Sequence, residues 1–183
     1  MKKLLALVIA GSALVACSSN KAPVEAPVAS APVAAPVASA PVVSNHNSVY
    51  FAFNKYDIKD DYAGVVKANG SYLAANAAAK VQVQGNTDDI GSVEYNLSLG
   101  QKRADAVKKA LIATGASKAQ VEATSNGKLK AKYANDTSEA RAMNRRADIT
   151  YKAAQPAGYS EDSNGLPMVD SSVYNGTVAQ GVE

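Results

Sequence analysis

Cysteine, histidine and tryptophan are nearly missing from this chain of 183 residues, which holds one cysteine, one histidine and no tryptophan. With Cys17 as the single thiol, the chain has no internal disulfide and no cysteine-based metal cluster. The one histidine, His46, precedes the part that we expect to fold, so no Ser-His-Asp triad is expected there. The sequence therefore indicates no metal and no cofactor, and it argues against common nucleophilic enzymes.

A hydrophobic run long enough to span a membrane is also missing. Residues 1–16 carry two lysines followed by a 13-residue uncharged run, whereas a spanning helix needs ~20 residues. This pattern is typical of a cleaved export signal. The sequence "LVAC" then resembles the lipobox of bacterial lipoproteins, in which the cysteine, here Cys17, is acylated and becomes the mature N-terminus. With Ser18 after it, the resemblance implies a lipid anchor, such as palmitate, at the periplasmic face of the outer membrane.

Aromatic residues are missing from the next segment, which repeats "APV". Residues 22–43 hold five prolines and no aromatic side chain, so they cannot build a core. Such a composition favours an extended, semi-rigid spacer. We therefore predict that residues 17–46 form a lipidated N-terminus and a spacer.

Charge divides the rest of the chain into two parts. Residues 46–152 hold 16 basic and 11 acidic residues, a net charge of +5, whereas residues 153–183 hold four acidic residues and no basic one. We expect a folded domain at 47–152 and a disordered acidic tail at 153–183. Nucleic acid is not an expected partner, because export separates the protein from it and no basic run alternates with aromatics.

Hydrophobic periodicity within 47–152 predicts alternating strands and helices. Strands are expected at 48–54, where an interior position is predicted, at 80–85, from 120, and at 146–151. Helices are expected at 60–77, at 137–144, and from between Asn96 and Ser98 to near Gly115. This order predicts an α/β two-layer sandwich, with one mixed sheet and the helices on one face.

Arg103 lies on the apolar face of the second predicted helix, among Leu99, Ala106, Val107 and Ala110. A guanidinium is costly to bury without an anionic partner. The nearest candidates are Asp88 and Asp89 in the preceding loop. Two interpretations follow from the residues alone: an internal salt bridge, or an arginine that binds the anionic group of a ligand.

Three stretches carry a family resemblance, namely "VYFAFNKYDI" at 49–58, "GNTDDIGSVEYNLSLGQKRADAVKKAL" at 85–111 and "NRRADITY" at 144–151. With the lipobox and the spacer, they resemble the OmpA-like domain family, as found in peptidoglycan-associated lipoproteins. By position, the acidic ligand residue of the family falls on Asp88 and its arginine on Arg103. Its other pocket positions fall on Phe53, Asn54, Tyr56, Asn96 and Leu99. Asn86 and Asn54 depart from the family, which commonly has histidine and aspartate there.

This resemblance implies non-covalent binding of the diaminopimelate in the stem peptide of peptidoglycan. The free end of diaminopimelate carries an ammonium and a carboxylate on one carbon, to which Asp88 and Arg103 are complementary. The resemblance also implies periplasmic partners of the Tol system, for which "NRR" at 144–146 is either a surface or a solvated strand edge, the edge being favoured. The main alternative is a wall hydrolase that uses Asp88 with Asp89 or Glu94.

Overall fold

The computed structural model describes residues 46–170. The predicted lipidation site Cys17, the spacer up to residue 45 and residues 171–183 lie outside this described part. In chain order the elements are β1 (Ser48–Tyr50), η1 (Asp60–Tyr62), α1 (Ala63–Ala75), β2 (Lys80–Asn86), α2 (Val93–Ala113), η2 (Lys118–Gln120), β3 (Val121–Gly127), α3 (Ser138–Asn144), β4 (Arg146–Ala153), β5 (Tyr159–Glu161) and β6 (Pro167–Val169).

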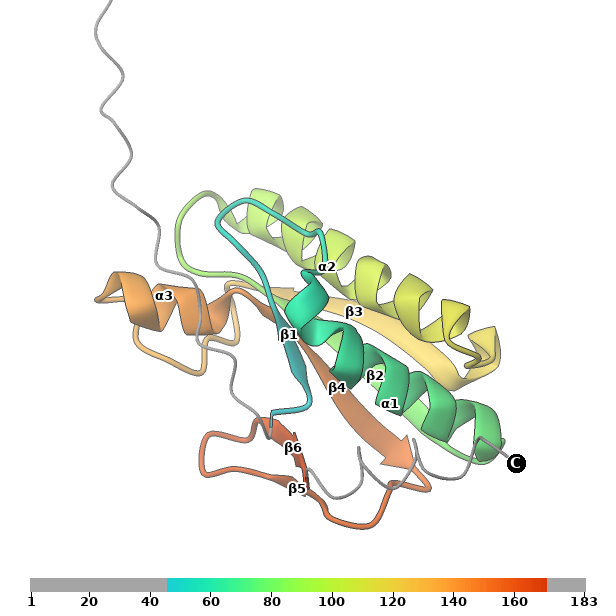
Figure 1. The fold of residues 1–183 in the computed structure, drawn as a ribbon. Helices are drawn as coiled ribbons and strands as arrows, with labels where there is room; N and C mark the ends of the chain where they lie inside the picture. The colour runs from blue at the N-terminus through green and yellow to red at the C-terminus, as the bar shows by residue number, and fades with distance from the viewer. Residues whose placement is uncertain (1–45, 171–183) are drawn as a thin grey trace, which may run out of the picture. The chain divides into compact units, whose positions relative to one another are not determined.

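Four strands form one mixed sheet in the order β1-β4-β2-β3. Strand β4 is antiparallel to both β1 and β2, and β2 is parallel to β3. Helices α1 and α2 lie side by side on one face of this sheet (Figure 1). The predicted α/β two-layer sandwich is therefore confirmed. Among the described residues, no helix combines the length and the apolar character that crossing a membrane requires.

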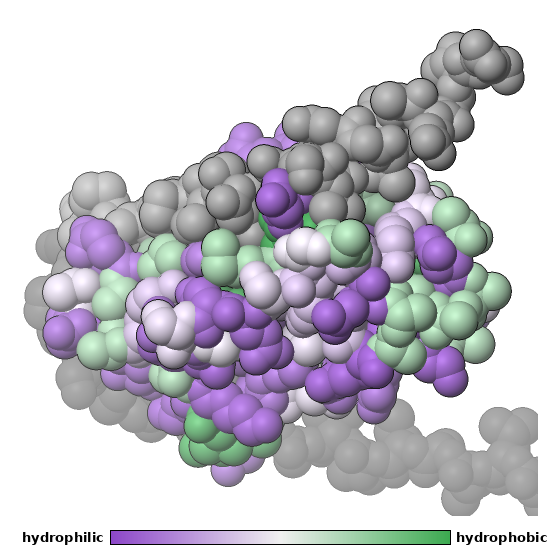
Figure 2. Space-filling model, turned by 90° about the horizontal axis from the view of Figure 1, so that it is seen from below, coloured by the Kyte–Doolittle hydropathy of each residue, from purple (hydrophilic) through white to green (hydrophobic). Residues whose placement is uncertain are grey.

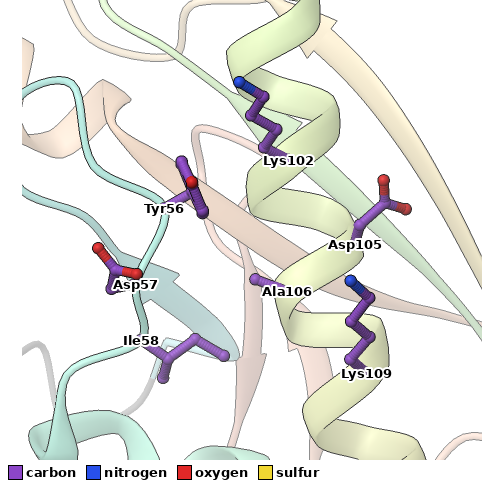
Figure 3. A pocket seen from close by; sticks show the side chains of 7 residues that line it. All are labelled: Tyr56, Asp57, Ile58, Lys102, Asp105, Ala106 and Lys109. Atoms are coloured by element: carbon purple, nitrogen blue, oxygen red, sulfur yellow. The ribbon is translucent and has the colours of Figure 1, made fainter.

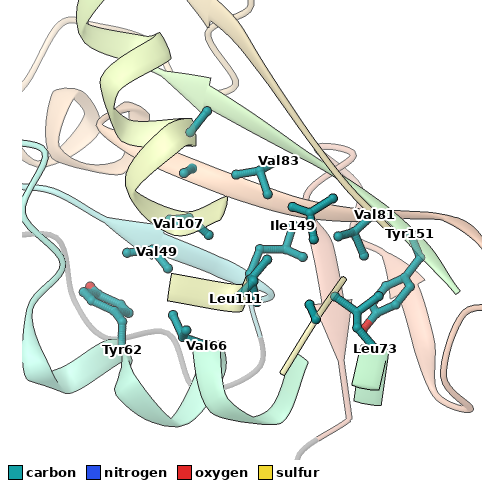
Figure 4. Packing of buried hydrophobic residues seen from close by; sticks show 14 of the residues in the cluster. Val49, Tyr62, Val66, Leu73, Val81, Val83, Val107, Leu111, Ile149 and Tyr151 are labelled. Atoms are coloured by element: carbon teal, nitrogen blue, oxygen red, sulfur yellow. The ribbon is translucent and has the colours of Figure 1, made fainter. Parts of the chain in front are cut away.

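The core fills the space between the sheet and the two helices (Figure 4). Alternation along β2 buries Val81 and Val83, and the corresponding side of α2 buries Val107 and Leu111. Gly85 lets α2 approach β2 closely, because a Cβ there would lie 1.8 Å from the carbonyl oxygen of Gly100. The helix therefore rests on the backbone of β2 just before residues 86–88, which form part of the candidate site.

Helix α2 begins earlier than predicted. Its N-cap is Ser92, whose Oγ accepts a hydrogen bond from Tyr95 N at 3.1 Å, an arrangement typical of helix starts. Asn96, near which the helix was expected to begin, lies inside the helix instead, and its Nδ2 donates to Ile90 O at 2.9 Å and to Ser92 O at 3.0 Å. The predicted end is confirmed, since Gly115 has φ +114 just after Ala113.

Strand β1 differs from the predicted interior strand at 48–54. It is three residues long and lies at the sheet edge. Its side chains are nevertheless buried on both faces, with Val49 and Tyr50 at most 2% exposed. Because both faces of β1 are buried, its sequence is rich in apolar and aromatic residues, as we expected only for an interior strand. Residues 51–59 leave the sheet and form a loop beside α2.

The prediction of a disordered tail from residue 153 is wrong for the described part of that segment. Strands β5 and β6 pair as a hairpin in which Leu166 is fully buried and Val169 is 2% exposed. The hairpin is joined to the domain through Asn47, whose N donates to Pro167 O at 2.7 Å. Asp162 closes the turn by accepting from Leu166 N at 2.8 Å. The net charge of the tail gives no indication that Asp162 caps a turn. The folded domain therefore extends to at least Val169.

Polar side chains dominate the face of the molecule seen from below, with small hydrophobic patches between them (Figure 2). On the sheet, the face opposite α1 and α2 carries Gln84, Asn86, Asn126, Asp148 and Thr150, which line a polar cavity. The sheet thus has one apolar face, which forms the core, and one polar face.

Candidate functional site

Three segments bring together most of the predicted site residues at one end of the sheet. The loop 51–59 carries Phe53, Asn54 and Tyr56, the segment 86–92 carries Asp88, and α2 carries Asn96, Leu99 and Arg103. Asp88, Asn96, Leu99 and Arg103 are buried, whereas Phe53 and Tyr56 are 40% and 44% exposed. The site therefore consists of a buried polar base and an exposed rim.

Arg103 is fully buried and has no carboxylate partner among the described residues. Its Nε donates to Lys55 O at 2.9 Å, its Nη1 to Asn86 O at 2.9 Å and its Nη2 to Ala52 O at 3.3 Å. Burial lowers the pKa of the guanidinium to about 10, although the charge of Asp88 acts in the opposite direction. Of the two interpretations of Arg103, the internal salt bridge with Asp88 or Asp89 is therefore wrong, and backbone carbonyls accept from the guanidinium instead.

The guanidinium of Arg103 also lies 5.2 Å from the ring centroid of Phe51, within range of a cation–π contact. Two of its three carbonyl partners, those of Ala52 and Lys55, belong to the loop 51–59. Arg103 therefore fastens this loop to α2 and to the end of β2. Its first role in the structure is to hold the rim in place.

Asp88 forms its ion pair with Arg145, a residue that sequence reasoning did not select. Arg145 Nη1 donates to Asp88 Oδ2 at 3.2 Å, and the two side chains are 2% and 5% exposed. Arg145 Nε also donates to Phe51 O at 3.2 Å. The predicted solvated edge at 144–146 is wrong, because Asn144, Arg145 and Arg146 are all buried. Arg145 caps the end of α3 and Arg146 begins β4, and these two neighbouring arginines are the sequence signal that was overlooked.

Acceptor atoms at the base of the site retain hydrogen-bonding capacity. Asp88 Oδ1 accepts one long bond, from Ile90 N at 3.3 Å. Asn96 is fully buried, and its Oδ1 has no hydrogen-bond partner within the described residues. Both side chains hydrogen-bond to the backbone of Ile90, so Asp88 and Asn96 belong to the same turn at the base of the site. A buried acceptor without a donor costs ~1–3 kcal/mol, and such a corner favours a ligand with N–H groups.

The exposed rim consists mainly of aromatic side chains. Tyr95, 48% exposed, donates its hydroxyl hydrogen to Asn54 Oδ1 and so connects α2 to the loop. Asn54 adopts φ 56, a left-handed conformation that asparagine tolerates better than most residues. The aspartate common in the family could accept the same bond, so Asn54 keeps the connection while removing a charge.

A groove of about 580 Å³ continues from the rim between residues 56–58 and α2. Figure 3 shows Tyr56 facing α2, with Lys102 and Lys109 on the helix side of the groove. Lys102 Nζ lies 5.6 Å from the ring centroid of Tyr56. The groove thus offers charged groups beside the aromatic rim.

Comparison with known proteins places this geometry in a family. A family model described as the OmpA family matches residues 50–145, more than half of the chain. The chain belongs to the OmpA family.

Several relatives of the OmpA domain share most of their length with this chain. It is 40% identical to the peptidoglycan-associated lipoprotein of Pasteurella multocida (strain Pm70), over 82% of this chain and 100% of that protein. It is also 40% identical to that of Haemophilus influenzae, over 79% of this chain and 95% of that protein.

Among solved structures, the peptidoglycan-associated lipoprotein from Burkholderia pseudomallei is 44% identical, with a TM-score of 0.57 over 57% of this chain and 89% of that one. The C-terminal domain of Helicobacter pylori MotB, 23% identical with a TM-score of 0.52 over 74% of this chain and 97% of that one, shares the fold. The sheet and the two helices described above are therefore the OmpA fold.

Proposed function

We propose that this protein is an outer-membrane lipoprotein that binds the diaminopimelate-containing stem peptide of peptidoglycan without a covalent bond. It would thereby tether the outer membrane to the cell wall. The names of its relatives support the wall-binding role. The observation that carries the ligand assignment is the buried pair of acceptors, Asp88 Oδ1 and Asn96 Oδ1, behind an aromatic rim.

The ammonium of diaminopimelate supplies the donors that this corner lacks. It would donate to Asp88 Oδ1 and to Asn96 Oδ1, and charge-assisted bonds of this kind contribute ~1.5–3 kcal/mol each. Asp88 need not release Arg145, because that residue bonds to the other carboxylate oxygen, Oδ2.

The ligand carboxylate meets an excess of positive charge. Within residues 46–170, Arg103 and Arg145 are two buried guanidinium groups near one buried carboxylate, that of Asp88, so positive charge exceeds negative charge among these three side chains. The backbone N–H groups at the start of α2 add partial positive charge. A zwitterion is therefore attracted at both ends, whereas a simple amine is attracted at one.

The rim side chains and the buried Leu99 complete the ligand site. Phe53, Tyr56 and Leu99 would cover the methylene chain of diaminopimelate, and Asn54 would hold the rim closed through Tyr95. The groove beside Tyr56 carries Asp57 and Asp105 as well as Lys102 and Lys109, and it would accommodate the charged groups of the remainder of the stem peptide.

Acylation of Cys17 would anchor the protein in the outer membrane, and residues 17–46 would give the domain its reach to the wall. Periplasmic proteins of the Tol system are the proposed protein partners, which connects the tether to envelope integrity and cell division. We propose a binder and not a hydrolase, because Asp88 is held by Arg145 and no second carboxylate is hydrogen-bonded to it in the described residues.

Retention on purified sacculi tests this function. The wild-type protein should be retained, and free meso-diaminopimelate should release it. Cadaverine should not, because it has the same two ammonium groups on a five-carbon chain but carries no carboxylate. Release of the protein by both compounds to the same extent would contradict recognition of the zwitterion.

Asp88→Asn should lose retention by about tenfold to a hundredfold, the effect of one charge-assisted contact. Asp89→Asn is the matched control, since this neighbouring aspartate is exposed. Because Asp88→Asn also removes the partner of Arg145, Tyr56→Ala provides a second test on an exposed residue. Normal retention of both the Asp88 and the Tyr56 variants would refute the assigned site.

A further inference from the structure

A second cavity lies on the polar face of the sheet, away from the two helices. Its volume is about 360 Å³, within the range of small-molecule sites. Strands β2, β3 and β4 form its floor, while the segment 130–132 and the β5–β6 hairpin form its walls. None of the residues that line it is aromatic. The cavity therefore offers polar contacts without a surface for stacking.

The floor is held by a connected set of hydrogen bonds. Asn126 Nδ2 donates to Asn86 Oδ1 and to Gln84 Oε1, both at 3.0 Å. Asn86 Nδ2 donates to Asp148 Oδ2 at 3.0 Å. Asp148 Oδ1 accepts from Ser48 Oγ at 2.7 Å and from Arg146 Nε at 2.9 Å. Since Asp148 is paired with a buried arginine, it adds little net charge to the cavity.

Lysines supply the charge of the walls. The ammonium groups of Lys130, Lys132 and Lys152 have no ion pair and no side-chain hydrogen bond within residues 46–170. Among the described residues that line the cavity, Glu161 is the one carboxylate besides Asp148. Three lysines against Glu161 give the cavity a net charge of +2 above a floor of amides and the Thr150 hydroxyl.

We propose that this cavity binds an anionic saccharide, a sugar ring that carries a carboxylate or a phosphate. The lysines would bind the acidic group, and the amide and hydroxyl side chains of the floor would bind the ring hydroxyls. The sugar class follows from the many fixed polar groups of the floor. The absence of aromatic side chains among the described lining residues argues against a stacked nucleobase. This site does not depend on the proposed diaminopimelate site, which lies beyond Asn86 on the other side of β2.

Titration calorimetry with the full chain in detergent micelles tests the proposal. N-acetylmuramic acid represents a carboxylate-bearing wall sugar, and glucose 6-phosphate represents a phosphorylated sugar. N-acetylglucosamine is the neutral match for the first, and inorganic phosphate tests the anion alone. At least one anionic sugar should bind in the millimolar range, and about tenfold more tightly than either N-acetylglucosamine or phosphate. The sugar that binds more tightly shows whether the acidic group of the natural ligand is a carboxylate or a phosphate.

Variants locate the binding. The double substitution Lys130→Gln with Lys132→Gln should weaken it at least about tenfold, whereas Lys108→Gln with Lys118→Gln, two lysines outside the cavity, should not change it. Asp88→Asn should lose sacculus retention and keep sugar binding, so failure of one site is distinguishable from failure of the other. Absence of binding of either anionic sugar, equal binding of the neutral sugar, or equal effects of the two double variants would overturn the proposal.

Discussion

Replacement of Arg103 by methionine should mainly lower the stability of the domain. The side chain is fully buried, and its guanidinium donates to the carbonyls of Ala52, Lys55 and Asn86. Each carbonyl left without a donor costs ~1–3 kcal/mol, so three cost ~3–9 kcal/mol. Because methionine fills similar space without a buried charge, part of this loss is offset. We therefore expect a net loss of ~3–5 kcal/mol in the free energy of unfolding.

For a domain of this size the loss corresponds to a fall of about 10–15 °C in melting temperature, measurable by calorimetry. The matched control is Lys109→Met, which replaces an exposed cation of the same helix and should leave the melting temperature nearly unchanged. Sacculus retention of the Arg103 variant, measured in the cold, should also weaken, because the loop that carries Phe53 and Tyr56 loses its attachment. A melting temperature within ~3 °C of wild type, together with complete loss of retention, would refute this reasoning. Arg103 would then be a ligand residue alone.

Three further predictions concern the hairpin, the buried tyrosines and the anchor. Leu166→Ala should lower the free energy of unfolding by ~2–5 kcal/mol in urea titrations, whereas Leu129→Ala, at a side chain 65% exposed, should not; equal effects would show that the hairpin does not support the core. Burial raises the pKa of Tyr62 from 10.0 to about 12. Between these values the unfolded tyrosine loses its proton and the folded one keeps it, so stability should fall as pH rises from 10 to 12; Tyr62→Phe should reduce this slope, and an unchanged slope would contradict the assignment. Cys17→Ala should abolish labelling by palmitate and membrane fractionation while sacculus retention persists; a variant that stays in the membrane fraction would exclude a lipid anchor at this cysteine.

Much of the fold could be predicted because it follows from local patterns. The alternation of Val81 and Val83, and the helical spacing of Leu99, Val107 and Leu111, each mark one buried face. The hairpin could not be predicted in this way. Its strands are three residues long, and its turn depends on Asp162, which was counted only as an acidic residue of the tail.

The structure brings the residues of the candidate site together, but their pairing could not be predicted. The sequence indicates that Arg103 needs partners, and the side chains of Asp88 and Asp89 are visible as candidates. Backbone carbonyls have no sequence signature, so the contacts with Ala52, Lys55 and Asn86 could not be foreseen. Because backbone carbonyls accept the hydrogen bonds of Arg103, Asp88 pairs with Arg145, which is 57 residues away in the sequence.

The two buried arginines explain how a loop without regular secondary structure can present a binding rim. Between Phe51 and Lys55, three carbonyl oxygens accept from a guanidinium, those of Ala52 and Lys55 from Arg103 and that of Phe51 from Arg145. Arg103 belongs to α2 and Arg145 directly precedes β4, so the loop is attached both to a helix and to the segment that enters the sheet. A rim fixed before the ligand arrives loses less conformational entropy on binding. The same arginines leave a positive charge beside Asp88, and the contacts that hold the rim therefore also favour a ligand that carries a carboxylate next to its ammonium.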